Sequence, residues 1–99
     1  MSSTIAYGIS SANFTVGSST AVLVTPNAST INNCLTVVIQ NNHGSNTLYV
    51  GDSTVSSSNY GVQLAFGASI SLDDLAPNMP VYVVASGAST PVSALYIKR

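Results

Sequence analysis

The chain of 99 residues is long enough for one domain with one hydrophobic core and too short for two. Hydrophobic residues make up 45% of it and charged residues only 5%, whereas roughly a quarter of an average soluble domain is charged. This balance excludes a disordered chain, which needs few apolar and many charged residues. It also excludes nucleic acid as a partner, because phosphate binding needs several basic contacts and the only basic residues are Lys98 and Arg99.

Short apolar stretches with a period of two recur along the chain, and this alternation is typical of β-strands. The expected strands are TIAYGI (4–9), NFTV (13–16), TAVLVT (20–25), CLTVVIQN (34–41), TLYVG (47–51), GVQLAF (61–66), ASISL (68–72), PVYVVA (80–85) and VSALYIKR (92–99). The alternation places apolar side chains on one face of each strand: Val37 with Ile39, Leu48 with Val50, Val62 with Leu64 and Phe66, and Val81 with Val83 and Ala85. The last stretch is nearly continuous in apolar residues, which favours a strand covered on both faces.

Clusters of Gly, Pro, Asn and Ser separate these stretches and are typical of turns. QNNHGSNTLYV (40–50) is predicted to form a β-hairpin, and only LDDLAPN (72–78) has the composition of a helical turn. The sequence therefore predicts an all-β fold, a small single-domain β-sandwich of jelly-roll or immunoglobulin-like type, with seven to nine short antiparallel strands. We expect residues 13–99 to form the sandwich and residues 1–12 an N-terminal arm or edge strand.

Side chains suited to catalysis or metal binding are too few to form a site. The sequence has one histidine (His43), one cysteine (Cys34) and three aspartates, whereas a metal site needs three or four converging ligands. Asp73 and Asp74 are adjacent and would point to opposite faces of a strand, so they do not form an acid–base pair. Cys34 is expected to be a small buried core residue. The sequence predicts a protein without catalytic residues, metal or cofactor, and hence not an enzyme.

Neither a secretion signal nor a membrane span is recognisable in the sequence. The stretch MSSTIAYGISS lacks a basic region and a continuous apolar region, and no apolar run approaches the roughly 20 residues needed to cross a bilayer. We expect a protein made in a cytoplasm that leaves it only as part of a larger particle.

The low charge has a further consequence for a sheet protein. Edge strands are commonly protected from pairing with other chains by Lys, Pro or bulges, and two basic residues cannot protect so many strands. With a net charge of −1, little repulsion keeps copies of the chain apart. The sequence therefore predicts a homo-oligomer or a subunit of a larger assembly.

Residues 36–87 resemble small β-sandwich proteins of tailed bacteriophage virions. The similarity lies in the pattern N-x-G-S-x-T-h-Y-h-G (h is apolar), a serine-rich loop, and then hxLxxGxSxxL and hYhhAS. The matching residues are Asn42, Gly44, Ser45, Thr47, Leu48, Tyr49, Val50, Gly51, Val62, Leu64, Gly67, Ser69, Leu72 and Val81 to Ser86. Where such proteins more often have Pro-Gly before the serine, this chain has Phe66-Gly67, which affects the turn type more than the fold.

The resemblance implies a capsid cement or decoration protein on the virion surface. Such a protein binds the major capsid protein on the outside of the lattice, often as a homotrimer, and stabilises it. A terminal arm often makes the capsid contact, which would make Ile5 and Tyr7 the anchors here. The first alternative is a receptor- or glycan-binding module of a head or tail fibre, with Tyr60 in the loop at 53–60 as the exposed aromatic contact. The second is a plain tail or connector subunit.

Overall fold

The computed structural model describes residues 8–24, 34–73 and 80–98. Within them the chain forms strands and connections and no helix. The described strands are β1 (Gly8–Val16), β2 (Val22–Leu23), β3 (Cys34–Asn41), β4 (Leu48–Gly51), β5 (Val62–Leu64), β6 (Ser69–Leu72), β7 (Tyr82–Ala85) and β8 (Thr90–Lys98). The all-β prediction is confirmed.

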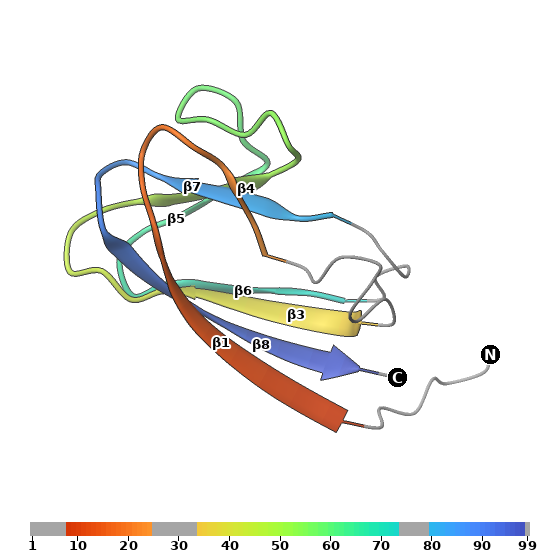
Figure 1. Ribbon diagram of the computed structural model, residues 1–99. Helices are drawn as coiled ribbons and strands as arrows, with labels where there is room; N and C mark the ends of the chain where they lie inside the picture. Colours follow the sequence, from red (N-terminus) through yellow and green to blue (C-terminus); the bar gives the residue numbers. More distant parts are fainter. Residues whose placement is uncertain (1–7, 25–33, 74–79, 99) are drawn as a thin grey trace.

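The strands form two antiparallel sheets that face each other across the core (Figure 1). Sheet A has the order β1-β8-β3-β6, and sheet B has the order β2-β7-β4-β5. Consecutive strands alternate between the sheets except for β4 and β5, which are neighbours in sheet B. This order is that of a jelly roll, so the structure decides between the two sandwich types that the sequence left open.

The core lies between the inner faces of the two sheets. Val37 and Ile39 of β3 are fully buried there, as are Leu48 of β4 and Val83 of β7, as the alternation predicts. Tyr96 of β8 is also buried, and its hydroxyl donates a 2.6 Å hydrogen bond to the carbonyl of Val24. An aromatic residue with a polar tip is stable in the core because that tip is paired.

Strand β8 is covered on one face and not on both. Val92, Ala94 and Tyr96 point into the core, whereas Leu95 on the outer face is 37% exposed. The nearly continuous apolar sequence of β8 therefore results from an uncharged outer face of sheet A. It does not indicate that a further layer of structure covers that face.

The stretch 40–50 is not a hairpin. Its first part ends β3 in sheet A and its last part forms β4 in sheet B, so residues 42–47 cross from one sheet to the other. The two strands of a hairpin are hydrogen-bonded neighbours in one sheet. The hairpin prediction was wrong because the period-two pattern shows where strands lie and not which strands pair.

A second correction concerns Phe66, which was expected on the apolar face of a strand. Strand β5 ends at Leu64, and Phe66 is 60% exposed in a turn over residues 65–68. The amide of Ala68 bonds the carbonyl of Ala65 at 3.0 Å, and Gly67 has φ +79°. These are the features of a type II turn, which needs a residue with positive φ at its third position.

The N-terminal boundary expected at residue 12 falls inside a strand. β1 runs without interruption from Gly8 to Val16 and lies at the edge of sheet A. The anchors Ile5 and Tyr7, and the expected helical turn after Asp73, lie outside the described residues.

Candidate functional site

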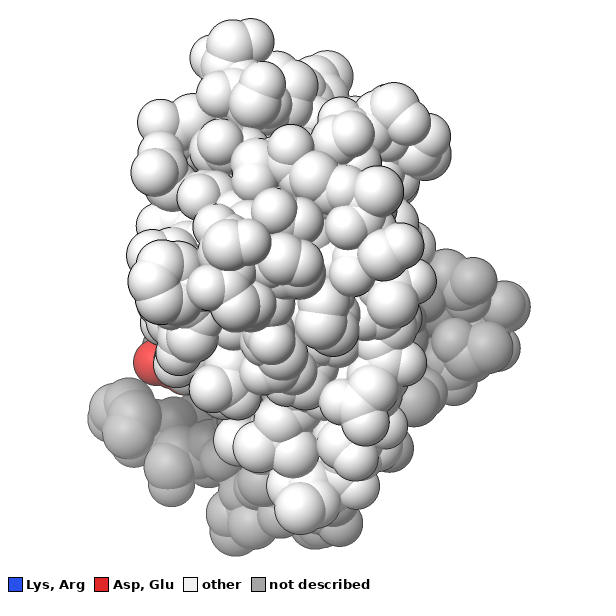
Figure 2. Space-filling view, turned by 90° about the vertical axis from the view of Figure 1, so that its left-hand side faces the viewer, with Lys and Arg blue, Asp and Glu red and all other residues white. Residues whose placement is uncertain are grey.

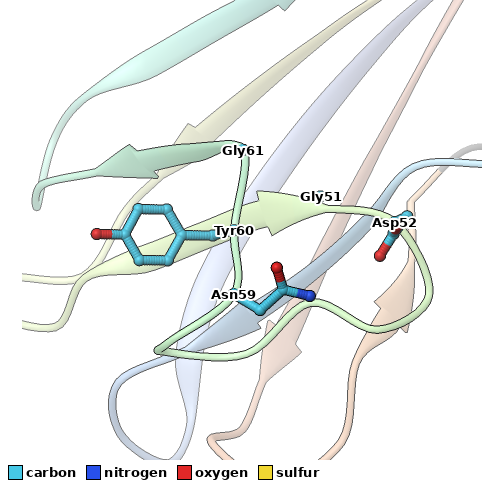
Figure 3. A pocket seen from close by; sticks show the side chains of 5 residues that line it. All are labelled: Gly51, Asp52, Asn59, Tyr60 and Gly61. Atoms are coloured by element: carbon cyan, nitrogen blue, oxygen red, sulfur yellow. The ribbon is translucent and has the colours of Figure 1, made fainter.

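The loop of residues 52–61, between β4 and β5, forms a pocket of about 280 Å³ together with the end of β4. The pocket is lined by Gly51, Asp52, Asn59, Tyr60 and Gly61 (Figure 3). It includes Tyr60, which the sequence singled out as an exposed aromatic contact.

Short-range hydrogen bonds give this loop its shape. The Asp52 carboxylate accepts bonds from the Thr54 hydroxyl at 2.6 Å and from the Thr54 amide at 2.9 Å. The Asn59 side-chain amide donates to the Thr54 hydroxyl at 2.9 Å, so it reaches across the loop. Ser56 and Asn59 also pair through their backbones. Asp and Asn side chains commonly organise turns in this way.

The charge of Asp52 is stabilised by the same contacts. Hydrogen bonds from the hydroxyl and then the amide of Thr54 lower the pKa of the Asp52 carboxyl below its ordinary value of 3.8. The carboxyl is fully exposed, so it is ionised at neutral pH and bears a negative charge at the pocket wall.

Tyr60 is 43% exposed and packs against Tyr49 of β4, with ring centroids 5.0 Å apart and planes tilted by 36°. Figure 3 shows its ring directed away from the side chains of Asp52 and Asn59. The aromatic ring and the polar groups therefore face different sides of the chain and do not converge on one ligand atom. This arrangement supplies an aromatic surface and no acid–base pair.

Val55 is a residue of this loop that sequence reasoning missed. It is buried although it lies in the polar run DSTVSSSN. A Cβ on Gly51 would lie 3.1 Å from a Val55 methyl group, so the absence of a side chain at Gly51 lets the loop pack against β4. A single valine among serines and threonines is the signal in the sequence.

His43 lies in the connection between β3 and β4, and its ring has hydrogen-bond partners there. Its ring Nδ1 accepts bonds from the backbone amides of Ser45 at 2.9 Å and Asn46 at 2.8 Å. The ring acts as the acceptor of its own turn, as Asn or Asp side chains often do. The ring of His43 therefore helps to shape this turn through its contacts to backbone amides.

A buried polar network lies next to this turn. The amide of the fully buried Asn41 donates to the carbonyls of Asn46 at 2.8 Å and Leu64 at 3.2 Å, and its oxygen accepts the amide of His43 at 3.0 Å. Asn46 in turn donates to the hydroxyl of the buried Thr90 at 2.9 Å. The network holds together the connections that cross between the sheets at this end of the sandwich.

The surface formed by these crossing connections is nearly uncharged. Figure 2 shows this end of the molecule with no Lys or Arg in view and acidic atoms only at the rim. The outer face of sheet A adds exposed apolar side chains, Ile9 of β1 and Leu95 of β8. Uncharged surface with exposed apolar residues is typical of contacts between proteins.

Within residues 8–24, 34–73 and 80–98, no three His, Cys, Asp or Glu side chains come close enough to hold a metal ion. The same residues contain no helix long and apolar enough to cross a membrane. Cys34 begins β3, and its side chain lies outside the described part.

Comparison with known proteins finds a similar fold in a protein of bacterial pili. No protein-family model and no curated protein sequence matches the chain. A solved structure of Bacillus endospore appendages, described as a novel family of disulfide-linked pili, is similar with a TM-score of 0.55 and 13% identity. The similarity covers 93% of this chain and 87% of the other. At this identity it shows that both chains share a β-sandwich architecture.

Proposed function

We propose that the chain is a non-enzymatic structural subunit that acts by packing against copies of itself or a protein lattice. The observation that supports this most is the uncharged surface at one end of the sandwich and on sheet A. We call this end, formed by the connections 42–47, 65–68 and 86–89 between the sheets, the crossover end. A surface that offers hydroxyls, amides and exposed apolar side chains meets little electrostatic repulsion from an identical surface. The described residues offer no converging catalytic groups that would support an enzyme.

The specific role that we propose is capsid cement or decoration on a tailed-phage head. Its support is the pattern around residues 42–51 and 62–86, which resembles virion proteins, together with the sandwich fold. In this role the chain would bind the outer surface of the capsid shell and bridge neighbouring capsid subunits.

A filament subunit is a related possibility, supported by the similarity to the endospore pili. Disulfide linkage, which describes those pili, fits this chain poorly. The sequence has one cysteine, so a copy can form a single disulfide, which joins two copies and does not extend to a third.

Immunogold electron microscopy of the cells that make the protein tests the role. With an antibody against the purified chain, gold should lie over phage heads and be absent from heads of a phage strain in which the gene is deleted. Gold along filaments would replace the capsid role with a filament role. Gold spread evenly through the cytoplasm, with none on any particle, would contradict the whole proposal.

The second candidate function is glycan or receptor recognition by the Tyr60–Tyr49 surface. The exposed Tyr60 ring and its partner favour it, since sugars stack on exposed aromatic rings. A glycan array should then show binding that Tyr60→Ala abolishes and that Phe66→Ala, at another exposed aromatic, leaves intact. Absence of binding by the wild-type chain would remove this candidate.

A further inference from the structure

Strand β1 is an edge strand without the usual protection against pairing. It extends over nine residues, Gly8–Val16, and within the described residues its one hydrogen-bonded neighbour is β8. Its sequence GISSANFTV contains no Lys, no Pro and no charged residue, and its register with β8 runs without a bulge. Its outward backbone groups form a row that another strand can pair with.

The length of β1 indicates which strand fits it. The other described edge strands, β2, β5 and β6, have two, three and four residues, and β8, which is as long as β1, is internal. An edge of nine residues is therefore matched only by β1 of another copy. Because both copies would offer the same edge, the contact is two-fold symmetric and antiparallel.

The side chains of β1 are compatible with such a contact. Ile9 is 69% exposed on the outer face of sheet A and lies opposite Ile97 of β8, next to the exposed Leu95. On the inner side, Phe14 is only partly buried at the open edge. A second strand alongside would remove apolar surface from water on both faces.

We propose that two copies of this chain associate by antiparallel pairing of their β1 strands, which joins the two A sheets into one continuous sheet. This inference rests on the proposed function as a self-associating structural subunit, and it specifies the surface through which two copies associate. A register centred on Ala12 keeps outer-face residues together and places Ser11 opposite Asn13 of the second copy. The contact builds pairs, and by itself does not build the trimer that the resemblance to cement proteins implies.

Charge substitutions at the exposed outer positions of β1 test the contact. In Ser11→Lys/Asn13→Lys, four lysines would gather across the two-fold axis, and in Ser11→Asp/Asn13→Asp four carboxylates would. Gln40→Lys/Gln63→Lys has the same net charge as the first variant, with its lysines exposed on strands away from β1. Masses are measured by light scattering, with circular dichroism to show that each variant is folded.

We expect the wild type and the Gln40/Gln63 control at twice the 10.1 kDa of the chain, and the two β1 variants at 10.1 kDa. An equimolar mixture of the Lys and Asp variants should return to twice 10.1 kDa, because opposite charges then face each other. This recovery requires β1 of one copy to pair with β1 of the other. It would not occur if the substitutions had prevented dimerisation by damaging the fold.

Three results would overturn the inference: a β1 Lys variant that keeps the wild-type mass, a mixture that stays monomeric, or a wild type with a trimeric mass that the β1 charges leave unchanged. None of these decides the proposed function, because gold labelling of a particle reports assembly through any surface. Conversely, particles without gold label together with dimers that depend on β1 would contradict the proposed role in a particle. The β1 contact between two copies would then still stand.

Discussion

At the scale of single residues, the crossover end is held by buried amides and hydroxyls and not by apolar packing alone. Asn41 is fully buried, and its side-chain nitrogen and oxygen both have partners, which lie in the β3–β4 connection and at the end of β5. A buried polar group that is fully paired specifies one arrangement of its surroundings, whereas a half-paired one is costly. Asn41 thus ties the β3–β4 crossover to β5.

Replacing Asn41 with Ala should lower the free energy of unfolding by about 3 kcal/mol, since two carbonyls and an amide would lose their partner. Asn42→Ala is the matched control. Asn42 is exposed and its side chain donates to the Ser93 hydroxyl, while its backbone bond to Pro91 does not depend on the side chain, so the substitution should change stability by about 0.5 kcal/mol or less. Urea unfolding of both variants measures the difference, and equal losses would contradict the role of Asn41.

His43 allows a similar comparison. His43→Ala removes the acceptor of two backbone amides and should cost about 1 kcal/mol. His43→Asn should retain most of the stability, because an Asn oxygen can accept the same amides in a turn. If thermal unfolding ranks the Asn variant no higher than the Ala variant, the imidazole does not act as a turn acceptor.

The charge of Asp52 gives a pH dependence with a definite sign. Because the bonds from Thr54 lower its pKa in the folded state, the stabilisation from Asp52 is present above the unfolded-state pKa and is lost as pH falls through the folded-state value. NMR titration of the Asp52 carboxyl should show a midpoint below 3.8, which Thr54→Val should move upwards. A midpoint at or above 3.8 in the wild type would contradict the hydrogen bonds to Thr54.

At the scale of elements, the turn that joins β5 to β6 explains how the chain departs from the Pro-Gly pattern of virion proteins. A type II turn accepts Pro at its second position and needs Gly at its third, and the chain retains Gly67 with φ +79°. The exposed Phe66 occupies the position where such proteins more often have Pro.

Phe66→Pro should therefore leave the fold intact and raise the free energy of unfolding by roughly 0.5–1 kcal/mol, because Pro restricts the unfolded chain. Gly67→Ala should lower it by about 1 kcal/mol or more, since a Cβ is strained at positive φ. Thermal unfolding of the two variants provides the check. Opposite signs are expected, and a stabilising Gly67→Ala would show that the turn is not type II.

These elements also show how far the sequence leads. Alternation predicted a strand that overlaps each described one, although it divided β1 into two. It also predicted the inward positions of Val37, Ile39, Leu48 and Val83, because a strand buried on one face must repeat with period two. It did not reveal that residues 40–50 cross between sheets, since pairing partners are set by contacts far along the chain. It also missed buried Asn41 and Val55, whose surroundings come from several distant connections.

At the scale of the whole molecule, the described residues form a jelly roll with four edge strands, of which β1 alone is longer than four residues. The chain has a net charge of −1, so ionic attraction or repulsion between copies is weak at any salt concentration. Association should then depend on backbone pairing and apolar contact. These terms change little with salt, in contrast to a charge-driven interface.

The central claim, that this is a self-associating structural subunit, is tested most directly by the mass of the purified wild-type chain. Light scattering at tens of micromolar should give a multiple of 10.1 kDa, with the same value at about 0.05 M and about 0.5 M NaCl. A sharp species of 10.1 kDa at both salt concentrations would contradict self-association.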